Sequence, residues 1–132
     1  MPHIAVDYSA NMETRTDIAK LCDHLRQAAI ATGVFPMPGI RVRAFCADHV
    51  SIADGDDQHG YVDISVRLRE GRDIDTRKAA AQAIFDSAQS FLAPVMAQHS
   101  IALSLEMRNI DAELSPKAGT IRQYTKTEGQ DV

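Results

Sequence analysis

The sequence predicts an α+β fold in which a four-stranded mixed sheet carries two helices on one face. Segments with strand-like alternation flank segments of helical periodicity, and this β-α-β order occurs twice, offset by about sixty residues as a pseudo-two-fold repeat. Parallel strands joined by a helix bury one sheet face beneath the helices. The length of 132 residues suits one domain, 1–132, with β-α-β units at 1–52 and 60–108 and a C-terminal arm at 109–132.

The first unit opens with a strand predicted over residues 2–8, where apolar residues stand at alternate positions. Residues 14–17, Thr-Arg-Thr-Asp, have the spacing of a capping box and predict a helix start. Apolar residues then recur at helical intervals as far as Ala29, and Gly33 predicts the helix end. Residues 40–49 return to strand character and complete the unit.

The second unit repeats this plan. Residues 61–69 alternate between apolar and polar side chains, as do residues 101–108. Asp73 or Asp75 can cap the intervening helix, and Pro94 should kink or end it because proline removes a backbone hydrogen bond. The predicted apolar stripe of this helix is Ala80, Ile84, Ser87 with Ala88, Phe91 and Val95.

Composition narrows the class of protein. The net charge of −4, without basic tracts, argues against nucleic acid or an anionic membrane as a partner. No apolar stretch approaches about 18 residues and no signal-peptide pattern opens the chain, so we expect a cytoplasmic protein. Cys22 and Cys46 are expected to be reduced. The sequence has no paired-cysteine metal pattern and no phosphate-binding glycine loop.

The acidic segment 54–60 superficially suggests a calcium site. It contains Asp54, Asp56 and Asp57, but it lacks the ligand spacing and the terminal glutamate of an EF-hand. A solvated turn is the better interpretation.

Pro2 is the most informative residue of the chain. Methionine is normally removed before a small residue, which would leave Pro2 with a free secondary amine. An α-amino group titrates near ~7.7–8.0, and burial or nearby cations lower its pKa further. Pro2 is therefore a candidate base, although a proline can also simply open an edge strand. His3 could orient a substrate beside it, but a strand histidine on a polar surface is more often structural.

Strand directions bring two arginines toward Pro2. If the two units join through antiparallel first strands, the sheet order is 2-1-3-4. Pro2 then opens the first strand, Arg41 opens the parallel second strand, and Arg72 follows the antiparallel third strand, all at one end of the sheet. Guanidinium groups bind carboxylates through paired hydrogen bonds. Each arginine alone could be a solvated surface charge, whereas their convergence predicts an anion-binding catalytic site.

The chain resembles the 5-carboxymethyl-2-hydroxymuconate isomerase family of the tautomerase superfamily, whose members use an amino-terminal proline. The resemblance runs in register from Met1 to about Leu114. It rests on Met1-Pro2-His3, Ala31-Thr32-Gly33-Val34-Phe35-Pro36, Gly39-Ile40-Arg41-Val42-Arg43, Ala53-Asp54-Gly55, Gly71-Arg72 with Arg77, and Leu103-Ser104-Leu105-Glu106. The segment that ends at Arg43 is the most specific part.

This resemblance implies a cofactor-free homotrimer in which Pro2 is the general base and Arg41 and Arg72 bind substrate carboxylates. The implied reaction moves a proton along an enol or dienol of a keto acid, 5-carboxymethyl-2-hydroxymuconate, during homoprotocatechuate breakdown. A broader tautomerase acting on phenylpyruvate-like enols and a catalytically silent trimeric binding module are the alternatives. Residues 44–46, Ala-Phe-Cys, replace a more polar family stretch and could alter the pocket wall, and the sequence diverges from Ser115 onward.

Overall fold

A computed structural model describes residues 1–125, and the end of the predicted arm, residues 126–132, lies outside the described residues. The strands and α-helices are β1 (His3–Ser9), α1 (Ile18–Ala31), β2 (Arg41–Ala47), β3 (Gly60–Arg69), α2 (Ile74–Met96) and β4 (Ile101–Ile110). Short 3-10 helices are η1 (Ala10–Thr14), η2 (Met37–Gly39), η3 (Ala112–Leu114) and η4 (Ile121–Tyr124).

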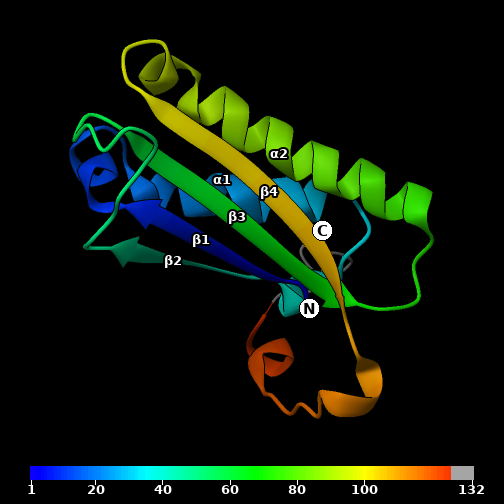
Figure 1. Cartoon of the computed structure of the whole chain (residues 1–132). Helices are drawn as coiled ribbons and strands as arrows, with labels where there is room; N and C mark the ends of the chain where they lie inside the picture. Colours follow the sequence, from blue (N-terminus) through cyan, green and yellow to red (C-terminus); the bar gives the residue numbers. More distant parts are fainter. Residues whose placement is uncertain (126–132) are drawn as a thin grey trace.

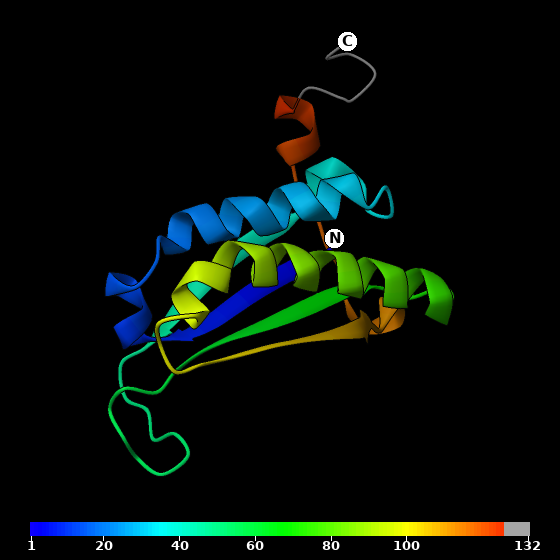
Figure 2. The same ribbon diagram turned by 90° about the horizontal axis from the view of Figure 1, so that it is seen from above.

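The four strands form one mixed sheet in the order β2-β1-β3-β4, which is the order that follows when the two units join through their first strands (Figure 1). β1 is parallel to β2 and antiparallel to β3, and β3 is parallel to β4. Both α-helices cover the same face of the sheet (Figure 2). The central pair, β1 and β3, therefore joins the two β-α-β units through their first strands.

The core lies between this sheet face and the helices. Alternate residues of β1 and β3 point into it, because side chains on a strand alternate between the two faces. Each fully buried aliphatic side chain stabilises the fold by about 1.5–3 kcal/mol relative to its exposed state. Fully buried members include Ile4, Val6, Leu21, Leu25, Val62, Ile64, Val66, Leu68, Ile84 and Leu92. The opposite sheet face carries His3, Asp7, Arg43, Asp63 and Arg67, and no described helix covers it.

The start of α1 differs from the prediction. Thr14 ends η1, and the helix begins at Ile18, where the Asp17 carboxylate caps it by accepting a hydrogen bond from the Lys20 N–H over 3.1 Å. The predicted capping box at 14–17 is therefore wrong, because the residue that has the capping conformation is the last of those four. The predicted stop is confirmed, since the helix ends just before Gly33, which has a left-handed φ of 69°.

The second helix follows the prediction more closely. Asp73 caps it by accepting from the Thr76 N–H over 2.7 Å. Pro94 does not stop the helix at once, because α2 continues through it to Met96 and ends within the same turn. Ala80, Ile84 and Ala88 are buried as expected, whereas Leu92 is buried more completely than Phe91 or Val95. Among residues 1–125, no helix has the length and apolar character needed to cross a bilayer.

Candidate active site

A cavity of about 870 Å³ opens at the end of the sheet where β1 and β2 begin and β3 ends. Met1 and His3 line it from the N-terminal segment, and Arg41 lines it from β2. Arg72 lines it from the loop after β3, and residues 115–122 of the arm close its far side. Four segments that are distant in sequence thus meet at one place.

Pro2 stands between Met1 and His3, which line the cavity, and its own side chain is fully buried. Its carbonyl oxygen accepts a hydrogen bond from the Arg41 N–H over 3.1 Å, which continues the β1–β2 pairing. In this structure Met1 precedes Pro2, so the Pro2 nitrogen belongs to an amide and the free amine is that of Met1. Arg41 and Arg72 both reach the cavity that Met1 enters, as the strand directions indicated.

The amine at the start of the chain lies in an electropositive environment. Its burial lowers the pKa of the Met1 amino group below the ordinary value of 8.0, and nearby positive charges lower the pKa further. These charges are Arg41, Lys117, Arg72 and Arg122, in decreasing order of effect. Both effects disfavour the ammonium form, so the cavity favours a neutral amine that can accept a proton.

Gly39 makes room for the start of the chain. A Cβ atom at this position would lie 2.1 Å from the Met1 nitrogen and 3.3 Å from the Met1 Cα. Real side chains do not approach a backbone atom so closely, so the contact requires glycine here. Gly39 ends η2, which Pro36 and Pro38 hold beside the cavity. This explains the Pro-x-Pro-Gly pattern before β2.

The Arg72 guanidinium has a fixed orientation. It donates hydrogen bonds to the carbonyl oxygens of Arg69 and Val34, each over 3.1 Å. Its Cζ lies 5.5 Å from the centre of the Phe35 ring, within the range of a cation–π contact. Arg77 holds the Arg72 backbone by donating its Nε–H to the Arg72 carbonyl oxygen over 3.2 Å. The side chain is therefore preorganised at the cavity wall.

His3 is held as a neutral acceptor. Its Nδ1 lies 3.0 Å from Arg43 Nη1, and a guanidinium can only donate, so Nδ1 accepts this hydrogen bond. Partial burial lowers the pKa of His3, and the neighbouring Arg67, Arg43 and Arg41 lower it further. Arg41 and Arg67 flank His3 on the two adjacent strands. His3 lines the cavity, and its hydrogen bond with Arg43 fixes the orientation of its ring.

The cavity is more cationic than sequence reasoning indicated. Its lining includes six arginine or lysine side chains and, among the described residues, no aspartate or glutamate. Two were expected, and the other four are Arg67, Arg69, Lys117 and Arg122. The outward positions of Arg67 and Arg69 on β3 could have indicated their location. Nothing in the aperiodic arm indicated Lys117 or Arg122. A wall of this composition suits a substrate with several negative charges.

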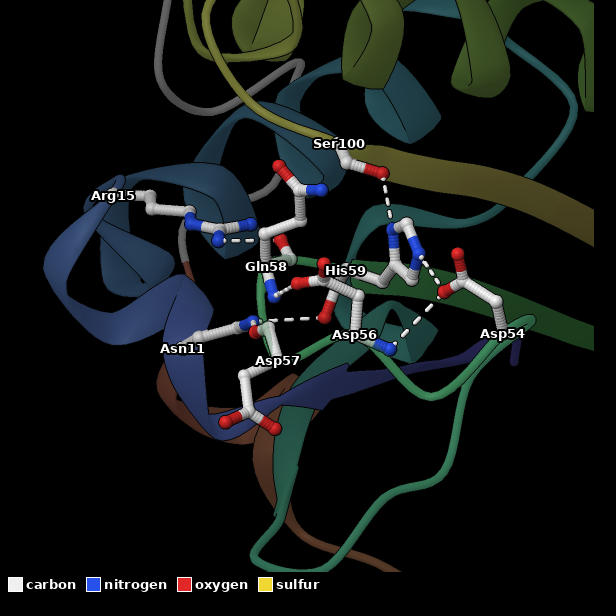
Figure 3. A network of polar contacts seen from close by, with 8 residues as sticks. All are labelled: Asn11, Arg15, Asp54, Asp56, Asp57, Gln58, His59 and Ser100. Carbon is white, nitrogen blue, oxygen red and sulfur yellow. Dashed lines mark hydrogen bonds and ion pairs between the residues drawn. The ribbon is translucent and has the colours of Figure 1, made fainter.

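The acidic loop forms a separate network at the opposite end of the sheet, where β3 begins (Figure 3). His59 bridges it, with Nε2 2.7 Å from Asp54 Oδ1 and Nδ1 2.7 Å from Ser100 Oγ. Asp56 accepts from the Gln58 N–H over 2.9 Å. These bonds tie the loop to the start of β4. Within residues 1–125, no group of three or more metal-ligating side chains is arranged to hold a metal ion.

Residues 44–46 do not contribute to the cavity wall formed by residues 1–125. Ala44 packs toward the core, whereas Phe45 points to the uncovered face and is 57% exposed. Phe45 pairs with Asp7, near the end of β1 that lies away from the cavity. The expected change to the pocket wall is therefore not seen in the single chain.

This four-stranded mixed sheet with two helices on one face is a β-α-β tautomerase-like fold. Solved structures of more distant relatives share the fold, among them native fused 4-OT, which is 19% identical with a TM-score of 0.60 over 92% of this chain and 97% of that chain. The chain belongs to the 5-carboxymethyl-2-hydroxymuconate isomerase family, whose model matches residues 2–125.

Individual members of the family match nearly the whole chain. A 5-carboxymethyl-2-hydroxymuconate Delta-isomerase of Escherichia coli is 29% identical over 126 residues, covering 96% of this chain and 100% of the relative. The crystal structure of a 5-carboxymethyl-2-hydroxymuconate delta-isomerase is 27% identical, with a TM-score of 0.87, 97% of this chain covered and 95% of that chain. A 5-carboxymethyl-2-hydroxymuconate isomerase from Deinococcus radiodurans R1 is 26% identical, with a TM-score of 0.86 and 95% of each chain covered.

Proposed function

We propose that this chain is a cofactor-free isomerase that moves a proton along the dienol of 5-carboxymethyl-2-hydroxymuconate in homoprotocatechuate degradation. The observation that carries the proposal is the N-terminal amine, whose pKa is lowered inside a cavity lined by six cations. A substrate with three carboxylates matches this charge. The Escherichia coli relative, a 5-carboxymethyl-2-hydroxymuconate Delta-isomerase over its full length, supports the same reaction.

Pro2 acts as the general base once Met1 has been removed. Its secondary amine then faces the cavity beside Arg41 and Arg72, and burial and these cations keep it neutral near physiological pH. The neutral nitrogen takes the proton of the enol hydroxyl, and the resulting ammonium returns a proton to carbon at the other end of the conjugated system. The double bonds shift accordingly, so no oxidant, reductant or co-reactant is needed. A base whose pKa lies near the working pH suits both transfers.

Arg41 and Arg72 bind substrate carboxylates and stabilise the enolate charge that develops between the two proton transfers. A preorganised donor does this best, because it does not have to reorient when the charge appears. Arg72 meets this condition through its bonds to Arg69 and Val34 and its contact with Phe35. Arg41 meets it through the strand pairing that holds its backbone against Pro2.

The active assembly in this proposal is a cytoplasmic homotrimer. The uncovered sheet face bears charged and polar side chains, which suits a polar subunit interface. Q0 fused 4-OT, a protein of similar fold that is 18% identical to this chain, forms a symmetric trimer. Cys22 and Cys46 are both free, as expected for a protein from a reducing compartment. Light scattering coupled to gel filtration tests the trimer.

The deciding experiment is Pro2→Ala. Alanine also permits removal of Met1, but its primary amine lacks the pyrrolidine ring that fixes the Pro2 nitrogen, so the base is no longer held in position. Intact mass confirms processing in both proteins. Turnover of 5-carboxymethyl-2-hydroxymuconate should fall by about 10²–10⁴-fold, the usual contribution of a positioned general base. The oligomer should be unchanged. Pro94→Ala, in α2 and remote from the cavity, is the matched control.

Three measurements separate this mechanism from the alternatives. Unchanged turnover in Pro2→Ala would refute the mechanism. Turnover of phenylpyruvate as fast as that of the tricarboxylate would indicate the broader tautomerase. A failure of the wild-type protein to exchange substrate α-protons with deuterated solvent would indicate a binding module without catalysis.

A further inference from the structure

The arm after β4 carries two cations over the cavity. Residues within 115–122 of the arm line the cavity, and the charged residues among them are Lys117 and Arg122. The arm lies at the same end of the sheet as the N-terminus, with η3 and η4 drawn in orange and red below it (Figure 1). η4 packs against η2, the element that also holds Gly39 at the cavity. The arm therefore forms the outer wall of the proposed active site.

Among the described residues, hydrogen bonds join this wall to the sheet and helices only at its base. The Ala112 N–H donates to Glu70 Oε1 over 2.7 Å, and Ser115 Oγ donates to the Asp111 carbonyl oxygen over 2.6 Å within the arm itself. In the part of the chain that the structure describes, no hydrogen bond joins residues 115–125 to residues 1–110. Segments held by so few contacts open at low cost in free energy.

The charges of the arm have no counterpart in the described protein. Lys117 and Arg122 are both exposed, and neither forms an ion pair with a described residue. They line the same cavity as Arg41 and Arg72, and all four lower the pKa of the same amine. Like charges that converge in this way repel one another. A polyanion between them turns the repulsion into attraction from both sides.

We propose that Lys117 and Arg122 bind a carboxylate of the substrate, so that the arm acts as a cationic clamp selecting multiply charged substrates. The proposal rests on the proposed function and adds specificity residues to it. Arg41 and Arg72 hold the carboxylates nearest the reacting atoms, and the arm holds one farther out. A monocarboxylate bound to Arg41 or Arg72 has no second charge for the arm. The arm thus discriminates between substrates that the base alone would treat alike.

The test compares two double variants of the processed full-length chain. Lys117→Ala with Arg122→Ala removes the arm charges. Lys20→Ala with Lys78→Ala removes two exposed charges from α1 and α2, outside the cavity. For the arm variant, KM for 5-carboxymethyl-2-hydroxymuconate should rise about tenfold, the smaller end of the range for losing hydrogen bonds to a charged group. The ratio of kcat/KM between this substrate and phenylpyruvate should fall by a similar factor, and the control should keep the wild-type ratio.

A binding measurement separates this proposal from the proposed function. Propane-1,2,3-tricarboxylate needs no turnover, and its affinity for both variants and for the wild-type chain can be measured by titration calorimetry. An affinity about tenfold lower in the arm variant than in the control supports the clamp even if the wild-type chain turns over neither substrate. Equal affinity in the two variants, or no binding to the wild-type chain, overturns it. Circular dichroism of both variants checks that they fold.

Discussion

The Arg41 N–H donates a hydrogen bond to the Pro2 carbonyl oxygen over 3.1 Å, so the proposed base and the nearest arginine are joined through their main chains. The bond uses no side-chain atom and therefore survives any substitution of Arg41 except proline. The Arg41 guanidinium, by contrast, lies 3.5 Å from the Gly39 carbonyl oxygen and remains available to a ligand. A substitution of Arg41 can therefore remove the guanidinium while the backbone hydrogen bond to Pro2 stays in place.

Replacing the Arg41 side chain should reduce catalysis without disturbing the strand. We expect Arg41→Ala to lower kcat/KM for 5-carboxymethyl-2-hydroxymuconate by about 10²–10³-fold, the usual effect of losing one donor to a developing oxyanion. Arg41→Lys keeps the charge but loses the paired donors, so it should recover only part of the activity. Steady-state kinetics measures both. Arg26→Ala, an exposed arginine on α1 whose ion pair is with Asp23, is the control.

The pH profile should report the perturbed amine. In the proposed mechanism the base works unprotonated, so kcat/KM should fall as the pH drops through the pKa of the amine. Burial and four cations lower the pKa of the Met1 amine in this structure, and the Pro2 amine enters the same surroundings. The acid limb of the processed enzyme should therefore lie below the ordinary ~7.7–8.0 of an α-amino group.

Removing one of these cations should move that limb. Lys117→Ala removes a charge that lowers the pKa of the amine, so the acid limb should shift to higher pH. Lys20→Ala, outside the cavity, should leave it in place. A limb at the same pH in all three proteins would show that another group controls the profile.

Gly39 should matter differently before and after Met1 is removed. In Gly39→Ala the new Cβ would lie 2.1 Å from the Met1 nitrogen, so the unprocessed protein must shift to accommodate it. Overpacking of this kind costs about 1–3 kcal/mol. Thermal unfolding of both forms, separated by mass, should show a larger loss of stability when Met1 is present. Equal losses would mean that Gly39 is required for some other contact.

The start of α1 can be tested by substitution. Asp17→Ala removes the carboxylate that accepts the Lys20 N–H, which should cost about 1 kcal/mol of folding free energy. Thr14→Ala removes only an exposed 3.3 Å bond to the Asn11 carbonyl oxygen and should cost less. Urea denaturation compares them. The reverse order would restore Thr14 as the cap that the sequence pattern suggested.

The sheet order was predictable in part. A crossover helix makes the strands that it joins parallel, so the pairs β1–β2 and β3–β4 follow from the sequence, whereas the antiparallel join between β1 and β3 was a supposition that the structure bears out. The N-cap residue of α1 was harder to predict from the sequence. Thr14, Thr16 and Asp17 can all accept hydrogen bonds from backbone amides, and only packing decides which of them does so.

The composition of the cavity was predictable in part. Strand directions alone brought Arg41 and Arg72 to one end of the sheet. Lys117 and Arg122 were not predictable, because the arm has no periodicity and its position depends on tertiary contacts with η2 and Glu70. In the sequence, a charged residue of an aperiodic segment looks identical whether its side chain points to water or to a substrate. Only the folded chain distinguishes the two.

β1 begins two residues from the start of the chain and is hydrogen-bonded on both sides, to β2 and β3. An affinity tag fused before Met1 would therefore have to leave through the cavity, past Gly39 and the arm. It would also keep the Pro2 nitrogen in an amide. If Pro2 is the base as proposed, a preparation carrying such a tag would be inert, and an assay on it would give a false negative. Purification through a removable or C-terminal tag avoids this artefact.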